Sequence, residues 1–299
     1  MLTRRRLAKL GLTTLAGVIA ADWPNLGTAA ESRLAGLPHA FLTAEANSGG
    51  RLGVAVLDTG TGEATGHREN EFFPMCSTFK VLAVAAVLSR IDAGIEQLAR
   101  RVRIERSALL AYAPVTKQHA DAEMSVGELC AAALTLSDNT AANLLLASLG
   151  GPSAVTQYTR ELGDSVTRLD RTEPGLNTAE AGDPRDTTTP LAMARNLAAL
   201  TSGTALSPAS RELMINWLVG CKTGDAKLRA GLPKAWRVGD KTGSGAHGTS
   251  NDVAVIWPPG RAPLIITAYL TQTDQPDDMR NASFVTIGRA VAATLEPGK

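Results

Sequence analysis

A serine and a lysine three positions apart are the first residues in this chain that could do chemistry. Ser77 and Lys80 open an Ala- and Leu-rich stretch with helical periodicity, so we expect their side chains on one face, one turn apart. A serine hydroxyl becomes a good nucleophile when a base removes its proton, and a neighbouring desolvated lysine can supply that base. A helix N-cap is the alternative for Ser77 taken alone.

Two further polar motifs follow along the chain. Ser-Asp-Asn at 137–139 lies between two helical segments, where capping alone would also explain it. Lys-Thr-Gly at 241–243 opens toward a strand pattern, so its side chains are expected to line the edge of a sheet. A second Lys-Thr-Gly at 222–224 follows a helix that ends near Gly220, and we interpret it as a helix stop and turn.

The order of these three motifs resembles that of the penicillin-recognising serine hydrolases, and the set is the one known for class A β-lactamases. Between the second and third motifs, residues 171–177 resemble the omega loop of class A enzymes, with Asp186 as the partner of Arg171. That loop distinguishes a hydrolase from a transpeptidase. The resemblance covers the chain from about Arg51 onward, and 169–190 and 239–258 are most similar to the cefotaxime-hydrolysing branch.

The resemblance implies an activity and a role for each matching residue. The expected reaction is hydrolysis of the β-lactam amide of penicillins and cephalosporins through an acyl-enzyme on the serine, giving antibiotic resistance. The expected catalytic residues are Ser77, Lys80, Ser137, Glu173 and Lys241, and the expected substrate-binding residues are Tyr112, Asn139, Asn177, Thr242, Gly243 and Ser244.

Within this set, Ser77 would attack the lactam carbonyl, and the backbone N–H groups of Ser77 and Ser244 would hold the oxyanion. Lys80 and Glu173 would share the role of base in acylation, and which of them dominates stays open. Ser137 would pass a proton to the departing nitrogen.

The remaining roles concern the water and the substrate. Glu173 and Asn177 would position the deacylating water. Asn139 and Tyr112 would border the acylamino side of the substrate, and Lys241, Thr242 and Ser244 would bind its carboxylate. An ordinary exposed loop residue is the alternative interpretation of Tyr112.

The chain also departs from the family pattern. Neither Ser250 nor Asn251 is the arginine that many class A enzymes use to reinforce carboxylate binding, so the second cation is Lys227, Arg280 or absent. Lys227 taken alone is expected to be a solvated lysine. Cys130 matches one half of a disulfide found in some relatives, but Val84 stands at the partner position, so no bridge is expected.

Three other functions share some of these features. A D-alanyl-D-alanine transpeptidase or carboxypeptidase has the same three motifs, but Glu173 and Asn177 argue against it. A β-lactam sensor needs a transmembrane relay, and no apolar stretch is long enough. A zinc hydrolase needs clustered ligands, whereas His39, His67, His119 and His247 are scattered. We therefore predict no metal and no cofactor.

The elements that must position these residues follow from periodicity. Helical spacing is expected over 31–47, 77–90, 125–135, 140–149, 153–162, 190–200 and about 277–295, and strand patterns over 51–58, 63–67, 236–240, 251–257 and 263–271. Segments 108–122 and 169–189 resist helix assignment, and loops of that length in a compact domain are usually functional.

This order predicts an α/β fold: an antiparallel sheet formed from both ends of the chain, flanked by helices, with an inserted all-helical domain. The expected division is an export signal over 1–30, an α/β domain over 31–75 and 219–299, and a helical domain over 76–218 that contains the omega loop at 169–189.

Composition narrows the partners and the compartment. The 299 residues carry 30 basic and 29 acidic side chains, a balance that gives no sign of nucleic-acid binding. Arg4, Arg5 and Lys9 precede an apolar stretch over 10–21, which resembles a twin-arginine export signal, with an ordinary secretory signal as the alternative. We expect a periplasmic or secreted monomer without a stable membrane anchor, which meets the twin-arginine machinery in transit and takes β-lactams as substrates.

The cysteines give no disulfide framework. Cys76, Cys130 and Cys221 are few and odd in number for an exported protein. Although Cys76 adjoins Ser77, no histidine lies near it in sequence, so we expect it to be a packing residue.

Overall fold

The computed structural model describes residues 34–295. The predicted export signal lies outside these residues. Helix α1 (Leu37–Ser48) begins six residues later than the expected 31 and has a proline in its first turn, where the missing N–H and the fixed φ of proline suit a helix start.

A five-stranded antiparallel sheet joins the two ends of the chain. Its strands are ordered β2 (Ala64–His67), β1 (Arg51–Asp58), β9 (Leu264–Thr271), β8 (Ser250–Trp257) and β7 (Arg237–Ser244). The predicted hairpin between β1 and β2 is present, and eight residues of β1 pair with β9. The expected sheet built from both termini is confirmed.

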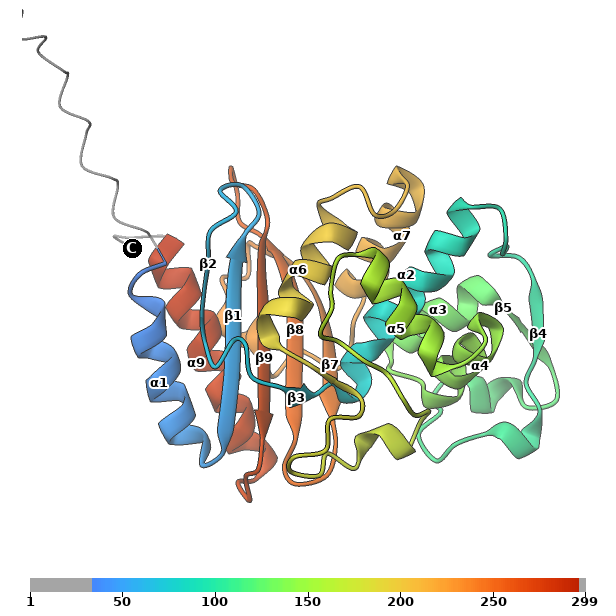
Figure 1. Cartoon of the computed structure of the whole chain (residues 1–299), viewed down its shortest axis with the longest axis horizontal. Coiled ribbons are helices and arrows are strands. Elements are labelled where there is room, and N and C mark those ends of the chain that lie inside the picture. Colours follow the sequence, from blue (N-terminus) through green and yellow to red (C-terminus); the bar gives the residue numbers. More distant parts are fainter. Residues whose placement is uncertain (1–33, 296–299) are drawn as a thin grey trace, which may run out of the picture. The chain divides into compact units, whose positions relative to one another are not determined.

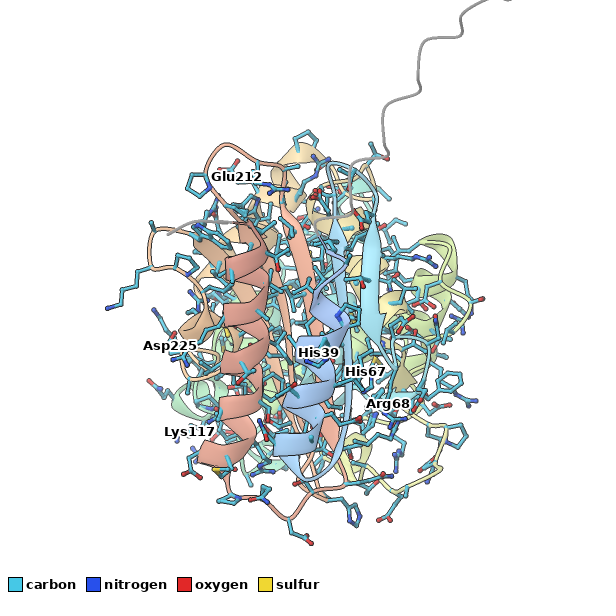
Figure 2. All side chains as sticks on the ribbon, turned by 90° about the vertical axis from the view of Figure 1, so that its left-hand side faces the viewer. His39, His67, Arg68, Lys117, Glu212 and Asp225 are labelled. Atoms are coloured by element: carbon cyan, nitrogen blue, oxygen red, sulfur yellow. The ribbon has the colours of Figure 1, made fainter. Side chains whose placement is uncertain are left out.

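Both faces of this sheet are apolar because helices cover both of them. Along β1, Val54 and Val56 pack against α1 and α9 (Asp277–Leu295), whereas Ala55 joins the core on the helical side. Successive side chains of a strand point to opposite faces of the sheet, and both faces are buried. The strands are therefore nearly continuous apolar runs in the sequence. Figure 1 shows α1 and α9 on one side of the sheet and α6 (Pro190–Thr201) on the other. Figure 2 faces α1 and α9.

The middle of the chain forms the expected helices. They are α2 (Phe79–Asp92), α3 (Val126–Thr135), α4 (Asn139–Leu149), α5 (Pro152–Glu161), α6 and α7 (Pro208–Val219). They share one core, which also includes residues from the near face of the sheet.

The described residues also contain short elements that periodicity did not predict. β4 (Arg101–Arg103) pairs with β5 (Glu123–Ser125), and β3 (Phe73–Pro74) pairs with β6 (Thr187–Thr188). The four-residue α8 (Leu228–Gly231) is likewise new. Strands of two or three residues are too short for an alternating pattern to identify.

Strand β7 is longer than expected and contains the Lys-Thr-Gly motif. The apolar pattern ends at Asp240, but pairing with β8 continues from Arg237 to Ser244. Since β7 is an edge strand, the motif lies at a free margin of the sheet, facing the helices. Within 34–295, no helix has the length and apolar character needed to cross a membrane.

Candidate active site

Ser77 lies in a 3₁₀ turn (Cys76–Thr78) just before α2, rather than in the α-helix itself as expected. Neither this turn nor α2 has a side-chain cap. The Ser77 hydroxyl instead donates to Glu173 Oε1 at 3.2 Å and accepts from Lys80 Nζ at 3.0 Å. Its neighbours are therefore ionisable groups, and the helix-cap alternative for Ser77 is excluded.

The Lys80 ammonium is surrounded by oxygen atoms. It is completely buried and lies 2.7 to 3.3 Å from Ser77 Oγ, the carbonyl and hydroxyl oxygens of Ser137, Asn139 Oδ1 and Glu173 Oε1. Burial lowers the pKa of Lys80, and the Glu173 charge opposes that shift. A lysine in this setting can give up a proton far more easily than one in water.

Ser137 connects this lysine to a second one. Its hydroxyl accepts from Lys241 Nζ at 2.9 Å and from Lys80 Nζ at 3.3 Å. The backbone of Ser137 is left-handed, with φ of 57°. Asp138, the next residue, caps α4 by accepting from the Ala141 N–H. Capping is thus the role of the middle residue of the Ser-Asp-Asn motif, and Ser137 and Asn139 face Lys80.

Lys241 projects from β7 into the helical side of the site and is completely buried. Besides Ser137, its ammonium donates to the Thr242 carbonyl at 2.7 Å. Burial and, as a smaller effect, the nearby charge of Lys80 lower the pKa of Lys241 to about 7. Lys241 therefore changes charge near neutral pH.

Glu173 approaches the serine from the 169–189 loop. Its side chain is buried, and Oε2 accepts from Asn177 Nδ2 at 2.5 Å. Asn143 on α4 holds its backbone from both sides: Asn143 Nδ2 donates to the Glu173 carbonyl and Asn143 Oδ1 accepts from the Glu173 N–H, each at 2.9 Å. Sequence reasoning missed Asn143, whose position within a helix gave no sign of a role.

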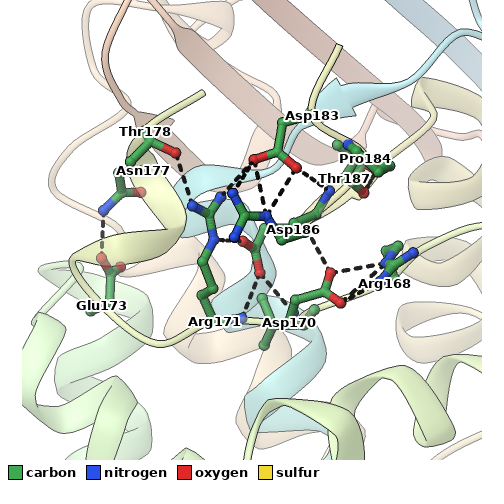
Figure 3. A network of polar contacts seen from close by, with 12 residues as sticks. Arg168, Asp170, Arg171, Glu173, Asn177, Thr178, Asp183, Pro184, Asp186 and Thr187 are labelled. Carbon is green, nitrogen blue, oxygen red and sulfur yellow. Dashed lines mark hydrogen bonds and ion pairs between the residues drawn. The ribbon is translucent and has the colours of Figure 1, made fainter. Parts of the chain in front are cut away.

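Figure 3 shows the ion pairs that close the base of this loop. Asp186 is completely buried and accepts from Arg171 Nε at 2.6 Å and from the backbone N–H groups of Asp170 and Arg171. Arg171 also donates to Thr178 Oγ1 at 3.0 Å, next to Asn177. The expected Arg171–Asp186 pair is present, and it connects both ends of the loop.

A cavity of about 390 Å³ opens over these groups. Eight of the predicted residues line it, and Lys80, Glu173 and Lys241 lie beneath as buried side chains. The lining comprises Ser77, Tyr112, Ser137, Asn139, Asn177, Thr223, Lys227, Thr242, Gly243 and Ser244. The structure thus brings all eleven predicted site residues together, with Tyr112 half exposed at the margin.

Two lining residues correct the sequence interpretation. Thr223 belongs to the Lys-Thr-Gly copy that we assigned to a turn, but its hydroxyl lies 2.6 Å from that of Thr242. Lys227 was either a second cation or a solvated lysine, and the solvated alternative is wrong: only 7% of it is exposed, and its ammonium donates to Ser250 Oγ at 2.8 Å and to the Asn251 carbonyl at 3.0 Å. Both residues are brought here by the chain reversal after α7, which local sequence does not reveal.

The three cysteines are free and buried, so the expectation that no disulfide forms is confirmed for the described chain. Burial and, as a smaller effect, the Glu173 charge raise the pKa of the Cys76 thiol to about 12. Cys76 therefore stays a thiol near neutral pH and is not a competing nucleophile.

Within residues 34–295, no group of three or more His, Cys, Asp or Glu side chains could hold a metal ion. His67, labelled in Figure 2, contacts Glu45 at 2.8 Å, and His247 contacts Glu180 at 3.3 Å. These histidines are engaged in ion-pair geometry away from Ser77. The chemistry available at the site is therefore that of an activated serine.

Comparison with known proteins agrees with this geometry. The sequence profile described as "Beta-lactamase enzyme family" matches residues 37–295. Over 236 residues, the chain is 55% identical to Beta-lactamase CTX-M-8 of Citrobacter amalonaticus and 54% identical to Beta-lactamase Toho-1 of Escherichia coli, covering 79% of this chain and 81% of each relative.

Solved structures give the same result. An ancestral class A β-lactamase is 60% identical with a TM-score of 0.84, covering 85% of this chain and 98% of that one. The class A enzyme of the last common ancestor of Gram-negative bacteria is 57% identical with a TM-score of 0.86, covering 87% and 99%.

Proposed function

This chain belongs to the class A serine β-lactamases, in the cefotaxime-hydrolysing branch, and from that premise we propose how its own residues carry out the reaction. The protein hydrolyses β-lactams and thereby confers antibiotic resistance, and the serine acyl-enzyme mechanism is general for the family. The assignments below concern individual residues.

Ser77 is the proposed nucleophile. The observation that carries this assignment is that its hydroxyl contacts both a buried amine and a buried carboxylate, at 3.0 and 3.2 Å. Either group can accept the serine proton as the oxygen attacks the lactam carbonyl. We assign the oxyanion site to the backbone N–H groups of Ser77 and Ser244, which belong to the turn and the strand on either side of the cavity.

Ser137 is the proposed proton carrier to the departing lactam nitrogen. Its hydroxyl lies between Lys80 and Lys241 and can take a proton from an ammonium as it gives one to the nitrogen. Deacylation is assigned to a water held between Glu173 and Asn177. In support, Asn177 Oδ1 is buried without a hydrogen-bond partner in the described structure, so it can accept from that water.

The substrate is held at its two polar ends. We assign the acylamino side to Asn139 and Tyr112, and the carboxylate to Lys241, Thr242, Gly243 and Ser244. Lys227 is the proposed second cation at the carboxylate end, because it lines the cavity, whereas Arg280 does not line it and its guanidinium contacts Asp277. Of the two cations that the sequence left open, the cavity lining supports Lys227.

The organisation and location of the protein are also proposals. We propose an α/β part over 31–75 and 219–299, a helical part over 76–218 with the loop at 169–189, and a site between them. We further propose that the enzyme acts as a monomer in the periplasm or outside the cell, after export by the twin-arginine route and loss of residues 1–30.

Covalent labelling tests the nucleophile directly. Brief exposure to a slowly hydrolysed β-lactam should add the mass of the inhibitor to the peptide that contains Ser77, as seen by mass spectrometry after digestion. Ser77→Ala should abolish the label, and Cys76→Ala should leave it in place. A label on Cys76 or Ser137 would contradict the assignment.

A further inference from the structure

The segment 223–229 is bound to one face of β7 and β8 beside the cavity. In the sheet register, Thr242 pairs with Asp252 and Ser244 pairs with Ser250. The side chains that the segment 223–229 contacts therefore lie on one face of the two strands. The contacts are Thr223 with Thr242, Lys227 with Ser250, the Leu228 N–H with Asp252 and Arg229 with Asp240. This segment presents Thr223 and Lys227 to the cavity.

The Lys227 ammonium has capacity for one more acceptor. Two of its three N–H donors go to Ser250 Oγ and to the Asn251 carbonyl, and Nζ lies 5.2 Å from the centre of the Phe284 ring. Both hydrogen-bond acceptors are neutral. Neither acceptor supplies a negative charge, so any compensation of the ammonium has to come from a carboxylate further away.

Asp252 is the carboxylate in position to provide it. It is completely buried in β8, and its Oδ2 accepts from the Leu228 N–H at 3.1 Å, directly after Lys227. Its Oδ1 has no hydrogen-bond partner in the described structure, and no cation lies within ion-pair distance of it. By contrast, the neighbouring buried Asp240 is paired with Arg229.

The two charges act on each other through space. Burial lowers the pKa of Lys227, and the charge of Asp252 is the largest effect that raises it again. Burial raises the pKa of Asp252, Asp240 adds to this, and Lys227 opposes it. Arg280 on α9 also lowers the pKa of Lys227, whereas the charge of Asp240 acts in the same direction as that of Asp252.

We propose that Asp252 is a positioning residue for β-lactam binding, which acts through Lys227. Its carboxylate fixes the backbone at Leu228 and supplies the negative charge that keeps the Lys227 ammonium charged at the carboxylate end of the cavity. This inference rests on the proposed role of Lys227. It assigns a function to a carboxylate that does not itself reach the substrate.

The test compares a penicillin with its methyl ester, which lacks the charged carboxylate. Asp252→Asn keeps an oxygen that can accept from the Leu228 N–H but removes the charge. We expect it to lower kcat/KM for the acid roughly fivefold, through KM, and to leave the ester unaffected. Lys227→Met should lower kcat/KM for the acid at least about tenfold. The control is Asp225→Asn, an exposed change in the same segment (Asp225 is labelled in Figure 2). It should leave kcat/KM unchanged for both the acid and the ester.

A double variant that combines Asp252→Asn with Lys227→Met tests the role of Asp252 separately from the role of Lys227. If Asp252 acts through Lys227, Asp252→Asn has no further effect once Lys227 is methionine. A normal ratio of acid to ester in Asp252→Asn, with a lowered ratio in Lys227→Met, overturns the role of Asp252 alone. An unchanged ratio in Lys227→Met overturns both roles but leaves the Ser77 chemistry intact.

A second measurement does not depend on the folding of the Asp252 variant. In the wild-type enzyme labelled with ¹⁵N-lysine, the Lys227 resonance, assigned by its absence in Lys227→Met, should have the shift of a charged ammonium at pH 7. A neutral amine there would overturn the proposal.

Discussion

Two buried lysines share one serine hydroxyl at the centre of this site. Ser137 Oγ lies 3.3 Å from Lys80 Nζ and 2.9 Å from Lys241 Nζ. Two ammonium groups this close to one atom repel each other, and burial removes the water that would screen them. The titrations of the two lysines are therefore coupled, and burial lowers the pKa of both of them.

The pH dependence of activity follows from Lys241. Its pKa is lowered to about 7, so the charged form is present below about 7 and is lost as pH rises through that value. We expect kcat/KM for a penicillin to fall on the alkaline side with this midpoint. Lys241→Arg should move the fall to higher pH, because a guanidinium stays charged. An alkaline limb that does not move in this variant would show that another group controls it.

Most of the proposed catalytic residues can be located from sequence motifs, but some of the residues that support them cannot. Ser77, Ser137 and Lys241 belong to motifs with fixed spacing, so a family resemblance identifies them. Asn143 carries no motif, and it holds the Glu173 backbone only because α4 packs against the 169–189 loop. Contacts of this kind depend on tertiary structure, and no local pattern encodes them.

The 169–189 loop positions a buried glutamate although it contains no α-helix and no long strand of its own. Its described residues contain one 3₁₀ turn (Gly175–Asn177) and the two-residue β6. The position of Glu173 therefore depends on Asn143 of α4 and on side chains at the two ends of the loop. Asp186 satisfies two backbone N–H groups and the Arg171 guanidinium from a completely buried position.

Asp186→Asn should therefore loosen this loop. Removing one partner of a buried ion pair can cost about 3 to 5 kcal/mol, and the expected consequence is a lower free energy of unfolding and slower deacylation. We expect small penicillins to suffer more than bulky cephalosporins. Pre-steady-state kinetics on both substrates would check this, with Glu180→Gln, an exposed charge in the same loop, as the control. Normal deacylation of both substrates would show that the pair is dispensable.

Element boundaries show what periodicity can and cannot predict. Strand β1 and helix α9 have the expected bounds because their apolar patterns run to their ends. In β7, the pattern stops at Asp240, and the strand continues through polar residues that pair with β8. Pairing with β8 extends β7 beyond its apolar part. The polar residues of the Lys-Thr-Gly motif occupy these last positions, so no apolar pattern marks them.

In the whole molecule, the site forms only where the first, middle and last parts of the described chain come together. Ser77 follows the first strands, Glu173 and Ser137 belong to the middle, and Lys241 comes from the end. The β1–β9 pairing joins the two ends. Because the three motifs come from different parts of the chain, they meet only when the described chain has folded.

The three cysteines of the described chain are free, so folding does not wait for a disulfide. This agrees with the proposed export of folded cargo, and Arg4 and Arg5 are the residues that the proposed signal should require. Replacing both by lysine should leave active enzyme in the cytoplasm, measured by cell fractionation with a chromogenic cephalosporin. Arg6→Lys serves as the control. Unchanged export would favour the ordinary secretory route.

In the proposed mechanism, Glu173 activates the water that releases acylated Ser77. In Glu173→Ala, Lys80 is still available as a base for acylation, but the water loses its carboxylate. Turnover should fall about a hundred- to ten-thousand-fold, while rapid-quench mass spectrometry shows nearly every Ser77 acylated within one turnover time. Glu180→Ala, the same change at an exposed position of the loop, should turn over normally. Near-normal turnover by Glu173→Ala, without accumulation of acyl-enzyme, would contradict the account.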